Sequence, residues 1–317
     1  MLDYATLYPL LHRHREDLTR PVEGFTLRGR VLDFNARRYL MGVINLSTDS
    51  AYRESICHDS ASAIARGRQL AAEGAELVDI GAESTLPDAR RVGPEEQIAM
   101  VRPVVEALAA DGLLVSVESY HPAVLEAAAR AGAAVFNLTG EREATAVLAL
   151  AARFDAAVIH CHVQGETVRE TSDFRRDYTG DGRAEDTGRS DIVGMMASDF
   201  ARRLEQARAS GVTRNIIDPG LGFYYRNLGD GAERVRHQLS LFAESFRLRA
   251  LGVPVMNILP HAPHIYGETN RRQAEPFFAV PALLGGSHII RTHEVAGVAR
   301  IRDLLGDFPT RHWGGPE

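Results

Sequence analysis

Short apolar runs recur along the 317-residue chain and alternate with longer stretches in which apolar residues return at helical spacing. Eight of these runs have the length of a β-strand: 39–47, 76–82, 113–119, 134–139, 156–162, 215–221, 253–259 and 288–293. Six of the seven intervals between them have room for a helix of ordinary length, and the interval between 119 and 134 has room for a short one. Repeated β–α units of this kind predict a parallel sheet.

The intervals carry helix start and stop signals. We expect helices over 60–73, 94–110 and 121–131. Pro94 and Pro122 stand near the starts of two of them, where a missing N–H is tolerated. Gly74 and Gly132 follow the ends of two of them, where a left-handed residue stops a helix.

Eight units with continuous apolar strands favour a closed (β/α)₈ TIM barrel over the alternative, an open doubly wound α/β sheet. No G-x-G-x-x-G follows the first strand, which argues against dinucleotide binding. We expect one barrel over 39–306, an N-terminal extension over 1–38 and a C-terminal tail over 307–317. The polar, Gly-rich span 164–190 is interpreted as a long loop at the rim.

Composition narrows the class of protein. No apolar run approaches the ~20 residues that cross a bilayer, and charges interrupt the N-terminal segment, so we expect a cytoplasmic protein without a membrane partner. The net charge of −6 argues against nucleic acid and favours a small-molecule substrate. Cys57 and Cys161 have no C-x-x-C spacing, which predicts reduced structural thiols.

The chain contains no lysine, so all 36 basic residues are arginine. Schiff-base aldolases, pyridoxal-phosphate enzymes and P-loop proteins each need a lysine amine. The sequence therefore excludes these three chemistries.

Polar residues gather where the apolar strands end, which in a barrel of this type is the rim that carries the active site. They are Asn45, Asp79, Glu83, Ser84, Thr85, Glu118, Asn137, His160, His162, Asp218, Asn257, His261, Arg291 and His293. Asp79 has two interpretations, a ligand contact or hydrogen bonds to loop amides. Of His160 and His162, we expect one to be a packing residue.

Two groups of these residues indicate a kind of ligand. Arg291 and His293 lie two apart on the last strand, share a face and favour a phosphate, although an ion pair of Arg291 with Glu294 or Glu268 is the alternative. Acceptors and an amide at Glu118, Asn137 and Asp218 suit a flat heterocycle that carries several N–H donors. Zinc is disfavoured, because His160–His162 (HCH) is the only local cluster.

At this point the chain resembles the dihydropteroate synthase family. The segments MGVINLSTDS, DIGAEST, SVES, FNLT, HCHVQG, DPGLGF and RTHEV match the strand-end motifs of that family in order, over about 39–306. The resemblance implies a homodimeric transferase of folate biosynthesis with a pterin-binding barrel. Such an enzyme joins p-aminobenzoate to a hydroxymethyl-dihydropterin diphosphate and releases diphosphate.

The resemblance also implies roles by position. Asn45 would bind Mg²⁺ and diphosphate, with Arg291 and His293 on the diphosphate; Asn137 and Asp218 would contact the pterin edge; Ser84 and Thr85 would belong to the loop over the arylamine. Asp218 and Glu118 become the candidates for catalysis, and Asp79 and His261 join the candidates for substrate binding.

Several positions depart from the pattern of the family. Glu118 replaces its usual Asp, Leu86 replaces an Arg, and MNILPHAPH stands where Ser-Arg-Lys is usual, so that Ala262 or a neighbour replaces the Lys. His261 is a partial substitute. The sequence therefore leaves three interpretations: a dihydropteroate synthase-like transferase with the usual or an altered heterocycle or amine, a non-catalytic paralogue, or a folate-dependent methyltransferase. The retained Asn45, Arg291 and His293 argue against the third, because methyl transfer releases no diphosphate.

Overall fold

The computed structural model describes residues 3–47, 49, 52, 55–86, 88–167, 173–174, 191–223, 225 and 228–308. The expected rim loop 164–190 and tail 307–317 lie largely outside these residues, so their form stays a prediction.

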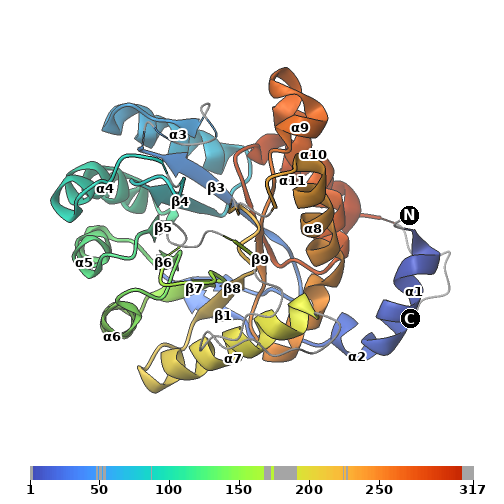
Figure 1. Cartoon of the computed structure of the whole chain (residues 1–317). Coiled ribbons are helices and arrows are strands. Elements are labelled where there is room, and N and C mark those ends of the chain that lie inside the picture. The colour runs from blue at the N-terminus through green and yellow to red at the C-terminus, as the bar shows by residue number, and fades with distance from the viewer. Residues whose placement is uncertain are drawn as a thin grey trace.

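Eight parallel strands form the centre of the molecule (Figure 1). They are β3 (Tyr39–Asn45), β4 (Leu77–Gly81), β5 (Leu114–Glu118), β6 (Val135–Leu138), β7 (Ala157–Cys161), β8 (Asn215–Asp218), β9 (Met256–Ile258) and β10 (Ile289–Thr292). Their hydrogen-bonded order is β8-β7-β6-β5-β4-β3-β10-β9. A parallel bridge between Ile217 and Val255 joins the two ends of this order. The predicted barrel is confirmed, and each strand is shorter than its apolar run.

Helices surround the strands (Figure 1). They are α3 (Ser60–Ala72), α4 (Pro94–Ala110), α5 (Pro122–Ala131), α6 (Ala144–Phe154), α7 (Ile192–Ala209), α8 (Gly231–Glu244), α9 (Pro263–Tyr266), α10 (Ala274–Leu284) and α11 (Val295–Gly306), with 3₁₀ turns η3 (Ser245–Leu251) and η4 (Glu268–Gln273). The three expected helices are α3, α4 and α5, within one residue at each end. Gly132 has φ of 112° and ends α5, as its position predicted.

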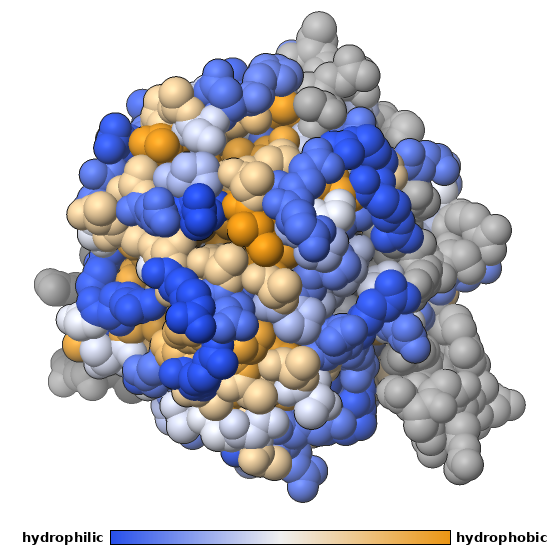
Figure 2. Space-filling view, turned by 90° about the vertical axis from the view of Figure 1, so that its left-hand side faces the viewer, coloured by the Kyte–Doolittle hydropathy of each residue, from blue (hydrophilic) through white to orange (hydrophobic). Residues whose placement is uncertain are grey.

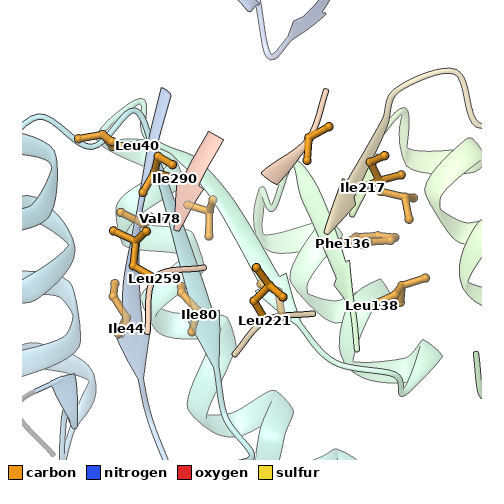
Figure 3. Packing of buried hydrophobic residues seen from close by; sticks show 14 of the residues in the cluster. Leu40, Ile44, Val78, Ile80, Phe136, Leu138, Ile217, Leu221, Leu259 and Ile290 are labelled. Atoms are coloured by element: carbon orange, nitrogen blue, oxygen red, sulfur yellow. The ribbon is translucent and has the colours of Figure 1, made fainter. Parts of the chain in front are cut away.

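Alternation along each strand divides the core into two layers. In β3, Leu40 and Ile44 face outward and pack against the helices, as do their counterparts on other strands (Figure 3). Tyr39 and Met41 face the interior and belong to a second cluster at the N-terminal end of the barrel. Because side chains alternate along a strand, the polar residues that share the inward parity at the C-terminal ends must meet inside the rim.

The N-terminal extension closes the other end of the barrel. It consists of α1 (Tyr4–Arg13), α2 (Arg15–Leu18) and a hairpin of β1 (Phe25–Leu27) and β2 (Arg30–Leu32). Arg28 and Gly29 both have positive φ, 48° and 78°, as a two-residue type I′ turn requires. Leu27 and Leu32 of the hairpin pack with the inward residues at the strand starts. The apolar side of the hairpin therefore plugs the barrel.

The outer face of the molecule mixes polar and apolar patches. Figure 2 shows the side on which α3 to α6 lie, where hydrophilic and apolar areas lie next to one another. Among the described helices, none is long and apolar enough to cross a membrane.

Candidate functional site

A hollow, which we call the outer hollow, opens at the rim where the strands end. Residues of β3, β4, β5, β9 and β10, of the loops after them and of the loop after β8 line it: Val43, Asn45, Ser47, Tyr52, Gly81, Glu83, Ser84, Thr85, Leu86, Glu118, Gly222, Ile258, His261, Arg291 and His293. An adjoining hollow, which we call the inner hollow, shares the wall formed by Thr85, Glu118, Gly222, Ile258 and Arg291. Its other lining residues are Asn137, Thr139, Cys161, Asp218, Gly220 and Phe223. Most of the predicted rim residues are therefore brought together.

Asp79 holds one side of this site in place. Its fully buried carboxylate accepts hydrogen bonds from Arg291 Nε at 2.8 Å, Asn137 Nδ2 at 2.9 Å and Ser116 Oγ at 2.6 Å. These donors come from three other strands, β10, β6 and β5, so Asp79 bonds side chains and not the loop amides that were one interpretation. Asp79 is not part of the lining of either hollow, but it orients Arg291 and Asn137, which are.

Arg291 lies between two acids. Besides Asp79, it donates from a terminal nitrogen to Glu118 Oε2 at 3.1 Å. Of the two expected alternatives, Glu294 pairs with Arg272 instead, at 2.7 Å, and the side chain of Glu268 lies outside what the structure describes. We call Asp79, Glu118 and Arg291 the carboxylate–arginine cluster. A charge-assisted pair that is buried in this way fixes the guanidinium at the wall of both hollows.

Asn137 presents an acceptor to the inner hollow. Its amide nitrogen donates to Asp79, which fixes the orientation of the amide. Its Oδ1 is buried and has no hydrogen-bond partner among the described residues. A buried acceptor without a partner costs free energy, about 1–3 kcal/mol, unless a ligand supplies a donor. This atom therefore indicates a ligand that carries an N–H or O–H group.

Two carboxyl groups beside this acceptor have raised pKa values. Burial raises the pKa of Glu118 to about 7, and the negative charges of Asp79 and Asp218 add to the shift while Arg291 opposes it. Burial also raises the pKa of Asp218 to about 6, against a hydrogen bond from the Gly220 amide. Gly220 has φ of 74°, so the turn after β8 needs glycine to bring that amide to within 2.8 Å of Asp218.

The opposite wall of the outer hollow consists of aromatic and imidazole rings. His293 Nδ1 lies 2.8 Å from Glu275 Oε1, and His261 Nε2 lies 3.3 Å from the same oxygen and 3.2 Å from His293 Nδ1. Tyr52 stacks on His293, with ring centroids 4.4 Å apart. We call His261, Glu275 and His293 the imidazole cluster. Burial lowers the pKa of His293 to about 4 despite the opposing charge of Glu275, which favours a neutral ring.

Three further predicted residues, Asn45, Ser84 and Thr85, also line the outer hollow. Asn45 ends β3 and its amide nitrogen donates to Ser55 Oγ at 2.5 Å, which orients the amide at the wall of the hollow. Ser84 and Thr85 line the hollow on the loop after β4, where Ser84 Oγ accepts from the Leu86 amide at 3.3 Å. All three residues line the outer hollow, and the roles that the resemblance implies for them stay predictions.

His160, His162 and Asn257 lie outside the lining of these hollows. His160 bonds Asn215 at 2.9 Å and His162 bonds Asp199 at 3.0 Å, and all four side chains are buried. The expectation that only one of the two histidines packs internally is wrong, because residues two apart share a side and this side faces α7. Asn257 is buried and donates to Ser245 and Ser287. All three residues stabilise the fold.

Another hollow lies at the plugged end of the barrel, beside Arg37, Arg38 and Arg302. Arg37 and Arg302 both pair with Glu76, and Arg38 donates to the Phe34 carbonyl. These guanidinium groups are thus engaged in structural contacts, so the chemistry of the molecule belongs to the rim.

Sequence reasoning missed Glu275. It belongs to α10 and not to the end of a strand, so the search along strand ends passed over it. A signal existed in the segment AEPFFAVPALL, where one acid stands among apolar residues near the start of a helix. Such a carboxylate, when fully buried, needs partners.

The rim of this barrel combines a buried acceptor, two acids and a fixed arginine, a set that suits a flat ligand with several hydrogen-bonding groups. Residues 41–293 match the family model described as pterin binding enzyme. The chain is 32% identical over 268 residues to the dihydropteroate synthase type-2 of Escherichia coli, across 82% of this chain and 92% of that protein. It is also 27% identical over 285 residues to the dihydropteroate synthase of Synechocystis, across 86% of this chain and 90% of that protein.

Solved structures agree with this assignment. The dihydropteroate synthase of Yersinia pestis, in a sulfonamide complex, superposes with a TM-score of 0.74 at 26% identity, across 92% of this chain and all of that one. The Xanthomonas albilineans enzyme, solved with 4-aminobenzoic acid, gives 0.71 at 28% identity, across 93% and 100%. The chain belongs to the dihydropteroate synthase family, and it is a transferase of that type.

Proposed function

We propose that the protein joins a hydroxymethyl-dihydropterin-type diphosphate to p-aminobenzoate or a related arylamine: the pterinylmethyl group passes to the amine nitrogen, and diphosphate is released. The observation that carries this proposal is the buried Oδ1 of Asn137, which lacks a partner among the described residues in a hollow that also contains Glu118 and Asp218. One acceptor and two acids in one narrow space suit the N–H edge of a flat heterocycle.

The second part of the proposal places the diphosphate in the outer hollow, against Arg291, His293 and Asn45. A fixed guanidinium is suited to a phosphate oxygen. The amide of Asn45 fits Mg²⁺ as one oxygen ligand, because this ion takes few protein ligands when phosphate oxygens and waters complete its shell. When bound, Mg²⁺ would neutralise charge on the leaving diphosphate.

The protein residues then have defined tasks. As the carbon–oxygen bond to diphosphate breaks, its electron pair leaves with the anion, and Arg291 stabilises that charge. The amine nitrogen forms the new bond to the carbon, and its proton passes to water or to the departing diphosphate. Asp218 and Glu118 hold the heterocycle so that the carbon faces the amine, which is the main requirement when the nucleophile is weak.

The amine pocket differs from the pattern of the family, which supports an altered acceptor. Leu86 lines the outer hollow where the resemblance places an arginine, and a buried Ala262 stands near the expected lysine. A carboxylate on the amine would therefore meet fewer cations. Assembly as a homodimer and a cytoplasmic location belong to the proposal on the strength of the family resemblance.

A turnover assay tests the proposal. The full-length protein, hydroxymethyl-dihydropterin diphosphate, Mg²⁺ and a panel of arylamines with and without a carboxylate are combined, and diphosphate release and the coupled product are measured. We expect product with at least one amine, and a loss of rate in Asn137→Ala. Binding of the pterin diphosphate without product from any amine would favour the non-catalytic paralogue. Absence of both binding and turnover contradicts the proposal.

A further inference from the structure

The imidazole cluster brings three metal-ligand atoms to one point. His261 Nε2, His293 Nδ1 and Glu275 Oε1 are separated by 3.2, 3.3 and 2.8 Å. They come from the loop after β9, from α10 and from the segment after β10. No two of these elements are adjacent in sequence, so the tertiary fold creates this convergence.

The separations agree with a coordination sphere. Bonds of about 2.0–2.2 Å from a tetrahedral zinc ion to nitrogen and oxygen place the ligand atoms about 3.3 Å apart. Two of the three observed separations have this value, and the third needs to open by a few tenths of an ångström. Two imidazoles and one carboxylate are also a ligand set of known zinc sites with an open position.

Hydrogen bonds to the second carboxylate oxygen of Glu275, Oε2, fix the position of the first, Oε1. Glu275 Oε2 accepts hydrogen bonds from the backbone amides of His293 at 2.8 Å and Glu294 at 3.2 Å, and from the Thr292 hydroxyl. Glu275 is completely buried. Oε1 is therefore presented to the two imidazoles by a rigid support, which is the role that outer hydrogen bonds play around metal ligands.

The cluster is also accessible. His261 and His293 both line the outer hollow, and the His261 side chain is 16% exposed. Tyr52 stacks on His293, with ring centroids 4.4 Å apart, and contacts His261 in a tilted arrangement, with centroids 4.6 Å apart. The rings are thus held between an aromatic cover and the body of the barrel, while an ion can enter from the hollow.

We propose that His261, Glu275 and His293 bind a borderline divalent metal of the Zn²⁺ class. Imidazole nitrogen favours such ions, whereas Mg²⁺ prefers oxygen ligands, so this site is distinct from the magnesium role expected for Asn45. The position that faces the hollow takes water or an oxygen of an anionic ligand. The metal site does not depend on the proposed transfer reaction.

Calorimetry on the full-length protein tests this site after dialysis against a chelator. ZnCl₂ and MgCl₂ are titrated in the absence of pterin and amine, and Co²⁺ is used for its visible absorption. We expect one Zn²⁺ per chain, no comparable binding of Mg²⁺, and Co²⁺ bands of a low-coordinate nitrogen and oxygen site. His261→Ala should weaken Zn²⁺ binding by more than about 100-fold, beyond the loss typical of an outer-shell partner.

His58→Ala is the matched control, because His58 is an exposed histidine outside the cluster. It should leave Zn²⁺ binding unchanged. His261→Asn, which keeps a polar side chain, serves if His261→Ala melts at a lower temperature than the parent. The proposal is overturned if the parent binds no stoichiometric Zn²⁺, or if the His261 variants bind it as His58→Ala does. The three side chains would then be only a hydrogen-bonded trio. Since no substrate is present, the result is separate from that of the turnover assay.

Discussion

The two walls of the outer hollow each contain a buried carboxylate, and they stabilise its charge in different ways. In the carboxylate–arginine cluster, Arg291 neutralises Asp79, and each member has a charged partner within 3.1 Å. In the imidazole cluster, a buried Glu275 faces two histidines, and no arginine among the described residues pairs with it. In the first wall, the charges of the protein already pair with one another, and a ligand contacts only the part of Arg291 that lines the hollow. The second has one negative group and room for a cation.

The largest expected effect follows from removal of Arg291. Arg291→Ala leaves the buried carboxylate of Asp79 without its cation, which should cost about 3–5 kcal/mol in the free energy of unfolding. Binding of diphosphate-bearing ligands should fall at least about 100-fold. Urea denaturation and calorimetry measure the two effects.

Arg272→Ala is the control for this change, because its pair with Glu294 belongs to a side chain that is 63% exposed. An exposed pair contributes about 0–1 kcal/mol. If both variants lose the same stability, the distinction between a buried wall and a surface pair fails.

The next effect concerns the acceptor in the inner hollow. Asn137→Ala removes one donor to Asp79 and should lower the free energy of unfolding by about 1–3 kcal/mol. It should also weaken a pterin-like ligand by roughly 10- to 100-fold. Asn257→Ala is the comparison, since Asn257 is equally buried but bonds two serines outside the hollows. That variant should lose stability and keep its ligand; weaker binding in both would place Asn137 among the purely structural residues.

Acidity should change the carboxylate–arginine cluster. The pKa of Glu118 is raised to about 7, so the group is neutral below that pH and negative above it. Affinity for an anionic ligand should therefore fall as pH rises, by about tenfold between pH 6 and 8. Asp218, with a pKa of about 6, acts in the same direction over a lower range. Glu118→Gln should flatten the upper part of the profile, and an unchanged profile in that variant contradicts the assignment.

The smallest effect concerns the cover of the imidazole cluster. Tyr52→Phe keeps the ring that stacks on His293 and loses the hydroxyl contact with Glu294. We expect a loss of about 0.5–1.5 kcal/mol in stability, the size of one ordinary hydrogen bond. Ligand binding should change by less than about threefold, that is, by less than about 0.7 kcal/mol. A larger change in binding would show that the hydroxyl, and not the ring, is the functional part.

Sequence patterns predicted the architecture well because strand length, helix spacing and end signals are local. They placed Asn137, Asp218 and Arg291 at one rim, since the C-terminal ends of parallel strands must meet there. They did not find Glu275, because its role depends on how α10 packs against the end of β10. They also did not separate Asp79, which supports the wall, from Asn137, which faces the ligand, since both have inward parity and only depth distinguishes them.

The hairpin that plugs the barrel has a kinetic consequence. With one end sealed by Leu27 and Leu32, whatever reaches Asn137 comes and goes through the same mouth beside Ser84 and Leu86. In a site that is closed at one end, the order of binding depends on how deep each ligand lies. A molecule seated against Asn137 must therefore arrive before a shallower partner, so the plugged end of the barrel imposes an order on binding.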